Sequence, residues 1–534
     1  MTRDSMLRIM FVASCGLLLG AVPNAAPSPA GAAPEASSDA MARCNALVGR
    51  KLASGTVEKV NYIAKGGKLV DQQTGFAAAF NGLTTPVPFC KVRAHLHPTP
   101  DSDITVETWL PDAWNGKMLG IGGGGFSGGL ATAALTLRAP MSSGYAAVAT
   151  DVGHPATETG EWAYGHPERL IDYGYRGNHL AALTAKEVIR AFYGKRAERA
   201  YFHGCSNGGR DALMEVSRFP TDYDGIIAGA PAMSFTPLLT SFVVNNLAVS
   251  RAPGLAAKLS LLNATVLKKC DGLDGVTDGV LDNPRQCAFD PTELQCKAGS
   301  GPNCLSADEV SAARTLYRGV RLSNGRQLMP GFAVGGETTG WSDWITAAKS
   351  QQNGLGSEAF RWLVHGDPKW DKTRFDVDRD YRLAEQRVGG IIDSDNPDVR
   401  AFTRRGGKLI VYHGWNDAAV PPENSLEYYD AVRRRSDPGG RSVRLFMAPG
   451  MSHCFGGPGP NSFDMLPDLD RWVEHGTAPE RIIATKFDND FLALLRMPAK
   501  VVRTRPLCAW PKTARYNGSG STDDAANFTC KGPQ

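Results

Sequence analysis

The sequence predicts an α/β fold: a mainly parallel sheet, covered by helices on both faces and interrupted by a long insertion. From about residue 116, short apolar runs alternate with segments whose apolar residues recur at helical spacing. This alternation stops near Met233 and resumes after Asn396. A chain of 534 residues is long enough for two or three structural units.

The predicted elements form two blocks, one on each side of the insertion. In the first block the expected strands are residues 117–123, 145–153, 199–204 and 223–231, and the expected helices are residues 179–194 and 208–219. In the second block the expected strands are residues 406–414 and 442–450, and the expected helices are near residues 423–435 and 466–476.

The N-terminus has the pattern of an export signal over residues 1–32. Arg3 and Arg8 precede an apolar run that is too short to span a bilayer comfortably, and a small-residue, proline-rich stretch follows. A lipoprotein cleavage site ending at Cys15 is the less favoured alternative. We expect a secreted or periplasmic protein without a membrane span. The expected parts are residues 33–233 for the first part of the core, 234–396 for the insertion and 397–534 for the second part.

Composition and cysteine content narrow the class of protein. The net charge is only +4 and long Lys/Arg runs are absent, so nucleic acid is not an expected partner. Ten cysteines remain after the signal, an even number that suggests five disulfides in an oxidising compartment. The spacing lacks the CxxC pattern and paired histidines of a zinc site. The ten are Cys44, Cys90, Cys205, Cys270, Cys287, Cys296, Cys304, Cys454, Cys508 and Cys530, of which Cys270/Cys287, Cys296/Cys304 and Cys508/Cys530 are natural local pairs.

Residues 204–208, GCSNG, fit the G-x-S-x-G turn between a strand and a helix. In such a turn the serine hydroxyl is exposed at the sheet edge, and the helix N-terminus favours negative charge. A plain tight turn is the alternative. Only one of Cys205 and Ser206 can face a pocket, and we assign Ser206 as the nucleophile.

A serine nucleophile needs a base and a carboxylate that orients it. Asp417 directly follows one predicted strand and His453 follows the next, in the order Ser, Asp, His. His413 is a rival base at the end of its strand, where local packing or hydrogen bonding is expected. His203, within the strand before Ser206, is expected to be structural.

Each proposed reactive residue has a cysteine neighbour. If Cys205 and Cys454 form a disulfide, their Cα atoms lie within about 7 Å of each other. The bond would then bring Ser206 and His453 together, and closing so long a loop could stabilise the fold by roughly 5 kcal/mol.

The glycine-rich stretch at residues 120–129 follows a predicted strand. It matches G-x-G-x-x-G, but it lacks the following helix and ribose-binding acid of a nucleotide site. In a hydrolase such a loop can offer a backbone N–H to an oxyanion. Gly124 is the first choice within residues 122–125, paired with the N–H of Asn207.

Closely spaced carboxylates lie between Cys270 and Cys287, and hard oxygen ligands at short spacing suit Ca²⁺. The pattern departs from the EF-hand, and a solvated acidic loop held by a disulfide is the alternative. The candidate ligands are Asp271, Asp274 and Asp278 with the carbonyls of Val276 and Val280.

Taken together, Cys205-Ser206, Asp417 and His453-Cys454 resemble the tannase and feruloyl esterase family, which includes mono(2-hydroxyethyl) terephthalate hydrolases. The resemblance covers essentially the whole mature chain. It implies an α/β-hydrolase fold with a large inserted lid domain, a triad braced by a disulfide, an oxyanion segment in the glycine loop and a structural Ca²⁺ in the lid. No organic cofactor is implied.

We therefore expect an exported serine esterase for esters of hydroxycinnamic, gallic or terephthalic acids. Trp341, Phe360 and Trp362 are candidates for an aromatic wall of the pocket, although the buried core of the lid is the more common place for any one of them. The alternatives are a serine esterase for non-aromatic esters, a non-catalytic secreted module that binds calcium or carbohydrate, and a nucleotide-dependent oxidoreductase. Neither the preferred ester nor the oligomeric state follows from the sequence.

Overall fold

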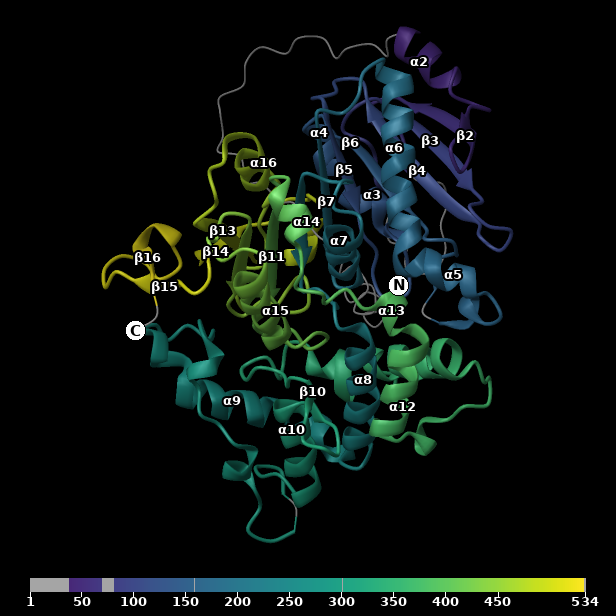
Figure 1. Ribbon diagram of the computed structural model, residues 1–534. Coiled ribbons are helices and arrows are strands. Elements are labelled where there is room, and N and C mark those ends of the chain that lie inside the picture. The colour runs from purple at the N-terminus through teal and green to yellow at the C-terminus, as the bar shows by residue number, and fades with distance from the viewer. Residues whose placement is uncertain (1–37, 70–80, 158, 300, 533–534) are drawn as a thin grey trace.

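The computed structural model describes residues 38–69, 81–157, 159–299 and 301–532 (Figure 1). The predicted signal segment and Cys15 lie outside these residues. The main sheet has ten strands in the order β1-β2-β3-β4-β6-β5-β7-β8-β11-β12. They are β1 (Lys51–Leu52), β2 (Gly55–Ile63), β3 (Phe89–Leu96), β4 (Ile104–Pro111), β5 (Lys117–Ile121), β6 (Ala146–Thr150), β7 (Arg199–Cys205), β8 (Gly225–Gly229), β11 (Lys408–Gly414) and β12 (Val443–Ala448).

The sheet has an antiparallel part and a parallel part. Strands β1 to β4 pair antiparallel, and β4 also pairs antiparallel with β6. The remaining pairs, β6-β5, β5-β7, β7-β8, β8-β11 and β11-β12, are parallel. The parallel strands are the six expected from the alternating pattern, whereas the antiparallel part precedes residue 116 and was not predicted.

Helices cover both faces of the sheet, because successive strand residues point to opposite sides. Met118 belongs to the apolar cluster that contains Val188 of α6 and Leu213 of α7, and its neighbour Leu119 belongs to the cluster that contains Trp472 of α16. The helices outside the insertion are α2 (Ser38–Asn45), α3 (Ala133–Thr136), α4 (Arg138–Ser142), α5 (Pro167–Ile171), α6 (Gly177–Tyr193), α7 (Asn207–Arg218), α15 (Pro422–Arg435), α16 (Leu466–His475) and α17 (Asp490–Leu494).

The chain between β8 and β11 is mainly helical, and most of it lies below the sheet in Figure 1. Its elements are α8 (Phe235–Ser250), α9 (Leu259–Cys270), α10 (Ala307–Arg318), β9 (Val320–Arg321), β10 (Gln327–Met329), α11 (Gln351–Glu358), α12 (Val377–Ala384), α13 (Gly390–Ile392) and α14 (Arg400–Arg404), with π-helical turns that include η9 (Ser342–Thr346) and η10 (Ala359–His365).

This insertion packs on loops at the carboxyl ends of the parallel strands. One apolar cluster joins Leu238 and Trp344 of the insertion with Phe126, Val152 and Ala418, which follow β5, β6 and β11 respectively. The insertion therefore covers the edge of the sheet where strand-end side chains converge.

The C-terminal segment adds two small antiparallel sheets. They pair β13 (Arg481–Phe487) with β14 (Val501–Cys508) and β15 (Thr513–Tyr516) with β16 (Phe528–Lys531). Val276 of the acidic loop packs in one apolar cluster with Ala514 and Phe528, so the end of the chain supports that loop.

Candidate active site

Ser206 lies in the turn between β7 and α7, at φ 63° and ψ −124°. A non-glycine residue in this region is strained, as expected for a serine held on a sharp strand-to-helix turn. A Cβ on Gly204 would lie 2.2 Å from the carbonyl oxygen of Gly208, so residue 204 must be glycine for the turn to close.

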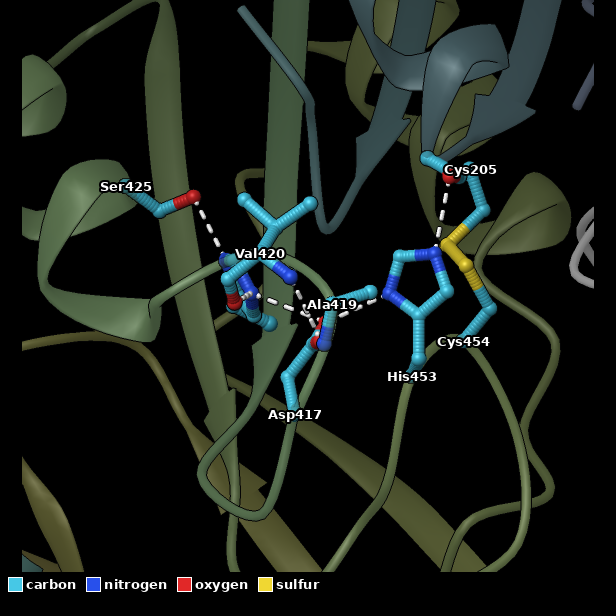
Figure 2. The surroundings of a disulfide bond; sticks show 9 residues. Cys205, Asp417, Ala419, Val420, Ser425, His453 and Cys454 are labelled. Carbon is cyan, nitrogen blue, oxygen red and sulfur yellow. Dashed lines mark hydrogen bonds and ion pairs between the residues drawn. A yellow bond between two sulfur atoms is a disulfide. The ribbon is translucent and has the colours of Figure 1, made fainter. Parts of the chain in front are cut away.

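Ser206, His453 and Asp417 form one chain of hydrogen bonds (Figure 2). His453 Nε2 lies 2.8 Å from Ser206 Oγ, and His453 Nδ1 lies 2.7 Å from Asp417 Oδ2. A carboxylate oxygen only accepts, so Nδ1 carries the proton and Nε2 is free to accept the serine proton. All three residues are buried. The arrangement can activate a hydroxyl as a nucleophile.

Asp417 is held as a carboxylate in a buried place. Its Oδ1 accepts the N–H groups of Ala419 and Val420 at 2.7 and 2.8 Å, and its Oδ2 also receives His413 Nε2 at 3.1 Å. Burial by itself would raise the pKa of Asp417, but the charge of His453 and the hydrogen bonds from both imidazoles outweigh it. The net pKa lies well below the usual value.

The two other candidate histidines have different surroundings. His413 hydrogen-bonds with Asp417, Val420 and Ser425, which agrees with the local hydrogen bonding expected of it. His203 is buried in β7, and burial lowers its pKa to about 4, so its imidazole is neutral at ordinary pH.

The disulfide between Cys205 and Cys454 joins the residue before Ser206 to the residue after His453, with Cα atoms 6.1 Å apart. Figure 2 shows the His453 ring between Asp417 and this bond. The three expected local pairs are also present, and Cys44 bonds with Cys90, a pairing that the sequence analysis did not specify. The other four bonds are Cys44–Cys90, Cys270–Cys287, Cys296–Cys304 and Cys508–Cys530.

The glycine loop lies beside the nucleophile turn, since a Cβ on Gly122 would lie 2.5 Å from the Cα of Gly208. The N–H of Gly124 donates to Ser127 O at 3.0 Å, so it is already used within the loop. In the described residues the next N–H, that of Gly125, has no hydrogen-bond partner. The carbonyl of Gly125 and the side chain of Asn207 both accept from Tyr173 Oη, at 2.9 Å each. As this loop stands, the N–H of Gly124 is therefore engaged within the loop, and the oxyanion role of Gly124 stays a prediction.

In the acidic loop, backbone and arginine donors occupy the carboxylates of the candidate calcium ligands. Asp271 accepts from Gly279 N, Asp274 accepts from Val276 N, and Asp278 forms an ion pair with Arg505. As they stand, the described residues offer no group of three or more His, Cys, Asp or Glu side chains arranged to hold a metal ion.

The chemistry of this loop nevertheless suits a hard cation. Burial, and then the charge of Asp274, raise the pKa of Asp282 to about 7. Burial also raises the pKa of Asp274. The raised pKa values mean that negative charge is poorly compensated here, and oxygen-coordinated Ca²⁺ would relieve it.

The aromatic candidates lie mainly in the core of the insertion. Trp341 is buried against Tyr317, and Phe360 is buried against Trp370. Trp362 is only partly buried, and its Nε1 donates to Glu358 at 2.8 Å. The burial of Trp341 and Phe360 agrees with the place in the lid core that was the more common expectation for them, and their contact with a substrate stays a prediction.

Trp344, which was not among the candidates, lies at the triad. Its ring meets the His453 ring edge to face, with centroids 4.9 Å apart. Trp344 follows Trp341 by three residues, one helical turn, and nothing in the local sequence separates the two roles. Only packing of the insertion on the sheet edge brings Trp344 to His453.

Comparison with known proteins agrees with this site. Residues 90–531 match the family described as tannase and feruloyl esterase. The chain belongs to the tannase and feruloyl esterase family. It is 34% identical over 546 residues to an uncharacterized esterase of Xanthomonas campestris pv. campestris, covering 92% of each chain. It is 33% identical over 499 residues to the mono(2-hydroxyethyl) terephthalate hydrolase of Piscinibacter sakaiensis, covering 81% of this chain and 82% of that one.

Solved structures of the family share the fold. Feruloyl esterase B from Aspergillus oryzae matches with a TM-score of 0.83 at 26% identity, over 92% of this chain and 100% of that chain. Tannin acyl hydrolase from Aspergillus niger matches with a TM-score of 0.70 at 21% identity, over 92% and 94%, and shows the fold alone. This member of the tannase and feruloyl esterase family is thus an α/β-hydrolase by fold and a carboxylic ester hydrolase by activity. The alternatives of a non-catalytic module and an oxidoreductase are therefore excluded.

Two further observations concern where this esterase works. Its five disulfides are typical of proteins that fold in an oxidising, extracytoplasmic compartment. A search of the described residues for helices long and apolar enough to cross a membrane found none.

Proposed function

We propose that this chain is an exported serine esterase that hydrolyses esters of aromatic acids through an acyl-enzyme. The observation that carries the proposal is the hydrogen-bonded chain Ser206–His453–Asp417, with a tryptophan edge against its imidazole. Two groups of relatives are named for aromatic-acid esters, terephthalate and ferulate. An esterase of a non-aromatic ester is the alternative.

The reaction follows from the atoms at the site. Ser206 Oγ attacks the ester carbonyl carbon as its proton moves to His453 Nε2, and the imidazolium is stabilised by Asp417. His453 then returns the proton to the leaving alkoxide, which departs as the alcohol. A water molecule then attacks the carbonyl carbon of the acyl-enzyme while His453 takes its proton as base. His453 returns that proton to Ser206 Oγ, which releases the acid and restores free Ser206.

The negative charge on the carbonyl oxygen needs N–H donors. We assign the backbone N–H of Asn207, at the first turn of α7, and that of Gly125 in the glycine loop. Asn207 lies in the nucleophile turn itself and Gly125 in the loop packed against it, and the helix N-terminus adds a favourable field.

Calcium in the acidic loop is part of the proposal. Asp271, Asp274 and Asp278, with the carbonyls of Val276 and Val280, would hold the ion, which supplies structural charge compensation rather than chemistry. The support is the set of oxygen donors within ten residues and the raised pKa values of Asp274 and Asp282.

The test is a substrate panel with purified mature protein. We expect hydrolysis of one or more of methyl ferulate, methyl gallate and mono(2-hydroxyethyl) terephthalate at rates well above those for aliphatic methyl esters. Ser206→Ala should lower turnover by about 10⁴-fold or more while circular dichroism stays unchanged. Retained activity in that variant would remove Ser206 from the mechanism. A preference for the aliphatic esters would remove the aromatic assignment and leave the serine mechanism standing.

A further inference from the structure

A second imidazole contacts the carboxylate of the proposed triad. His413 lies in β11, fully buried, and its Nε2 is 3.1 Å from Asp417 Oδ2 and 3.0 Å from the carbonyl oxygen of Val420. Its Nδ1 is 2.7 Å from the Oγ of Ser425 on α15. Figure 2 labels these three partners, Ser425, Val420 and Asp417.

These partners decide the protonation of His413. Its Nε2 faces two oxygens that can only accept, so Nε2 carries a proton. Its Nδ1 faces a hydroxyl that can donate, so a neutral ring satisfies every contact. A charged His413 would place two imidazolium groups on one buried carboxylate whenever His453 takes the serine proton, which is costly in a dry interior.

Other charges near this group are paired or exposed. Strand β8 carries no ionisable side chain, and on β12 Arg444 pairs with Glu480. On α15, Glu423 pairs with Arg285, and Glu427 is exposed. In the described part of the chain, the titratable groups that hydrogen-bond with Asp417 are thus the two imidazoles.

We infer that His413 is a positioning residue of the proposed esterase reaction. Its Nε2–H donates to Asp417 Oδ2, the same oxygen that accepts the hydrogen bond from His453 Nδ1–H. This second hydrogen bond holds the oxygen in place and offsets part of its negative charge. This inference rests on the proposed function. The backbone donors from Ala419 and Val420 fix Oδ1, and His413 fixes Oδ2. With all four donors in place, the carboxylate cannot rotate away from His453.

Two substitutions of His413 separate a donated hydrogen bond from mere bulk. His413→Gln keeps an N–H donor at the reach of Nε2, and His413→Met fills similar space without one. We expect His413→Met to lower kcat about tenfold to a hundredfold with KM changed less than threefold, because the lost bond involves a charged acceptor. His413→Gln should retain most of the wild-type kcat.

The pH profile gives a readout that a purely structural role would not move. Without the donor, the charge of Asp417 Oδ2 acts on His453 alone and favours its protonated form. The acid limb of kcat/KM in His413→Met should therefore move to higher pH, while His413→Gln leaves it in place. His203→Gln, a buried histidine on β7 without contact to the triad, is the matched control and should change neither kcat nor the acid limb.

The assay uses p-nitrophenyl acetate, so the result does not depend on acyl preference. Wild-type kcat and acid limb in a folded His413→Met variant would overturn the inference, and so would an equal loss in the Met and Gln variants. If His413→Met is unfolded by circular dichroism, Ser425→Ala takes its place, since it removes the hydroxyl that orients the ring. A fall in kcat of threefold or more is then expected, and unchanged kcat overturns the inference. Turnover of this ester by Ser206→Ala would instead defeat the proposed function itself.

Discussion

Two glycine-rich turns of this chain carry acidic or reactive side chains beside a disulfide, and they are built differently. The turn at residues 204–208 ends a central parallel strand, and Ser206 meets His453 and Asp417 from two other strand ends. The acidic loop at residues 270–287 lies in the insertion, away from the strand ends of the main sheet, and packs on the small C-terminal sheet. There Asp278 forms an ion pair with Arg505, and Asp271 accepts a hydrogen bond from the backbone N–H of Gly279.

The difference shows what a sheet edge contributes. Parallel strands in register bring their carboxyl ends to one edge, so residues more than 200 positions apart arrive at hydrogen-bond distance. A loop outside the main sheet is not constrained by strand register in this way. Its carboxylates accept hydrogen bonds from nearby backbone and arginine donors instead. The first site is therefore preorganised by the fold, whereas the second would be organised by the calcium ion proposed for it.

The two turns also differ in electrostatics. Asp417 is buried, yet two imidazoles hold its pKa below the usual value, and two backbone N–H groups also donate to it. Asp282 has a pKa raised to about 7 by burial and by the charge of Asp274. The negative charge of Asp417 is thus compensated by its neighbours, whereas that of Asp282 is not.

The largest expected difference between the two turns is in the stability lost when the disulfide beside each of them is removed. Replacing Cys205 and Cys454 together with serine opens a loop closed across a sequence separation of 249, worth about 5 kcal/mol in the chain-entropy model. The matched control, Cys270→Ser with Cys287→Ser, opens a separation of 17 and should cost about 3 kcal/mol.

Activity should separate these two variants more sharply than stability does. The first should lose most esterase activity even where it is folded, because the serine and base are no longer clamped. The second should keep its kcat in the presence of calcium. Chemical denaturation and kcat at a temperature where both variants are folded test this pair of expectations. Equal retention of kcat in both would show that the sheet alone positions the triad.

The next largest expected effect is the gain in stability when calcium binds to the acidic loop. A chelator-treated protein should gain about 3 kcal/mol of stability at a calcium concentration a hundred times the dissociation constant, since the ion binds only the folded loop. The melting temperature on calcium titration measures it. Asp274→Asn should abolish the response, and Asp308→Asn, an exposed acid at the start of α10, should keep it. A calcium-independent melting temperature in chelator-treated wild type would contradict the assignment.

The last effect is a pH dependence that comes from Asp282. Its folded-state pKa of about 7 lies above the value in an unfolded chain, near 4. Between these values the unfolded chain binds fewer protons than the folded chain, so stability from this group is present at low pH and is lost as pH rises toward 7. In chelator, Asp282→Asn should therefore raise stability at pH 8, by at most about 4 kcal/mol for a pKa raised from about 4 to about 7, and change little near pH 4.

Thermal melts of both proteins at the two pH values provide this measurement. A gain that is the same at both would indicate a packing effect instead of charge. Saturating calcium should shrink the gain at pH 8, because the cation then compensates the carboxylate of the wild type.

Much of the fold was predictable because its signals are local. Alternating apolar runs predicted the six parallel strands, and the position of the interruption predicted the insertion. The antiparallel part and the C-terminal sheets were missed because they contain no alternation with helices. The order Ser206, Asp417, His453 along strand ends was readable for the same local reason, as each residue directly follows an apolar run.

Details within loops were not predictable. Gly124 and Gly125 are adjacent and chemically identical, and only the hydrogen bond from Gly124 N to Ser127 O separates them. Trp341 and Trp344 differ by one helical turn, yet one is enclosed in the insertion and the other meets His453.

By itself, then, the sequence determined the order of the six parallel strands and the helices between them, the disulfide partners next to the reactive residues and the identity of the proposed triad, because these depend on residue type and on periodicity along the chain. The tertiary structure alone decided which glycine N–H is free, which tryptophan lies at the site and that His413 shares the carboxylate of Asp417. Those facts depend on contacts between segments that no local pattern encodes, made when the insertion and β11 pack at the same edge of the sheet.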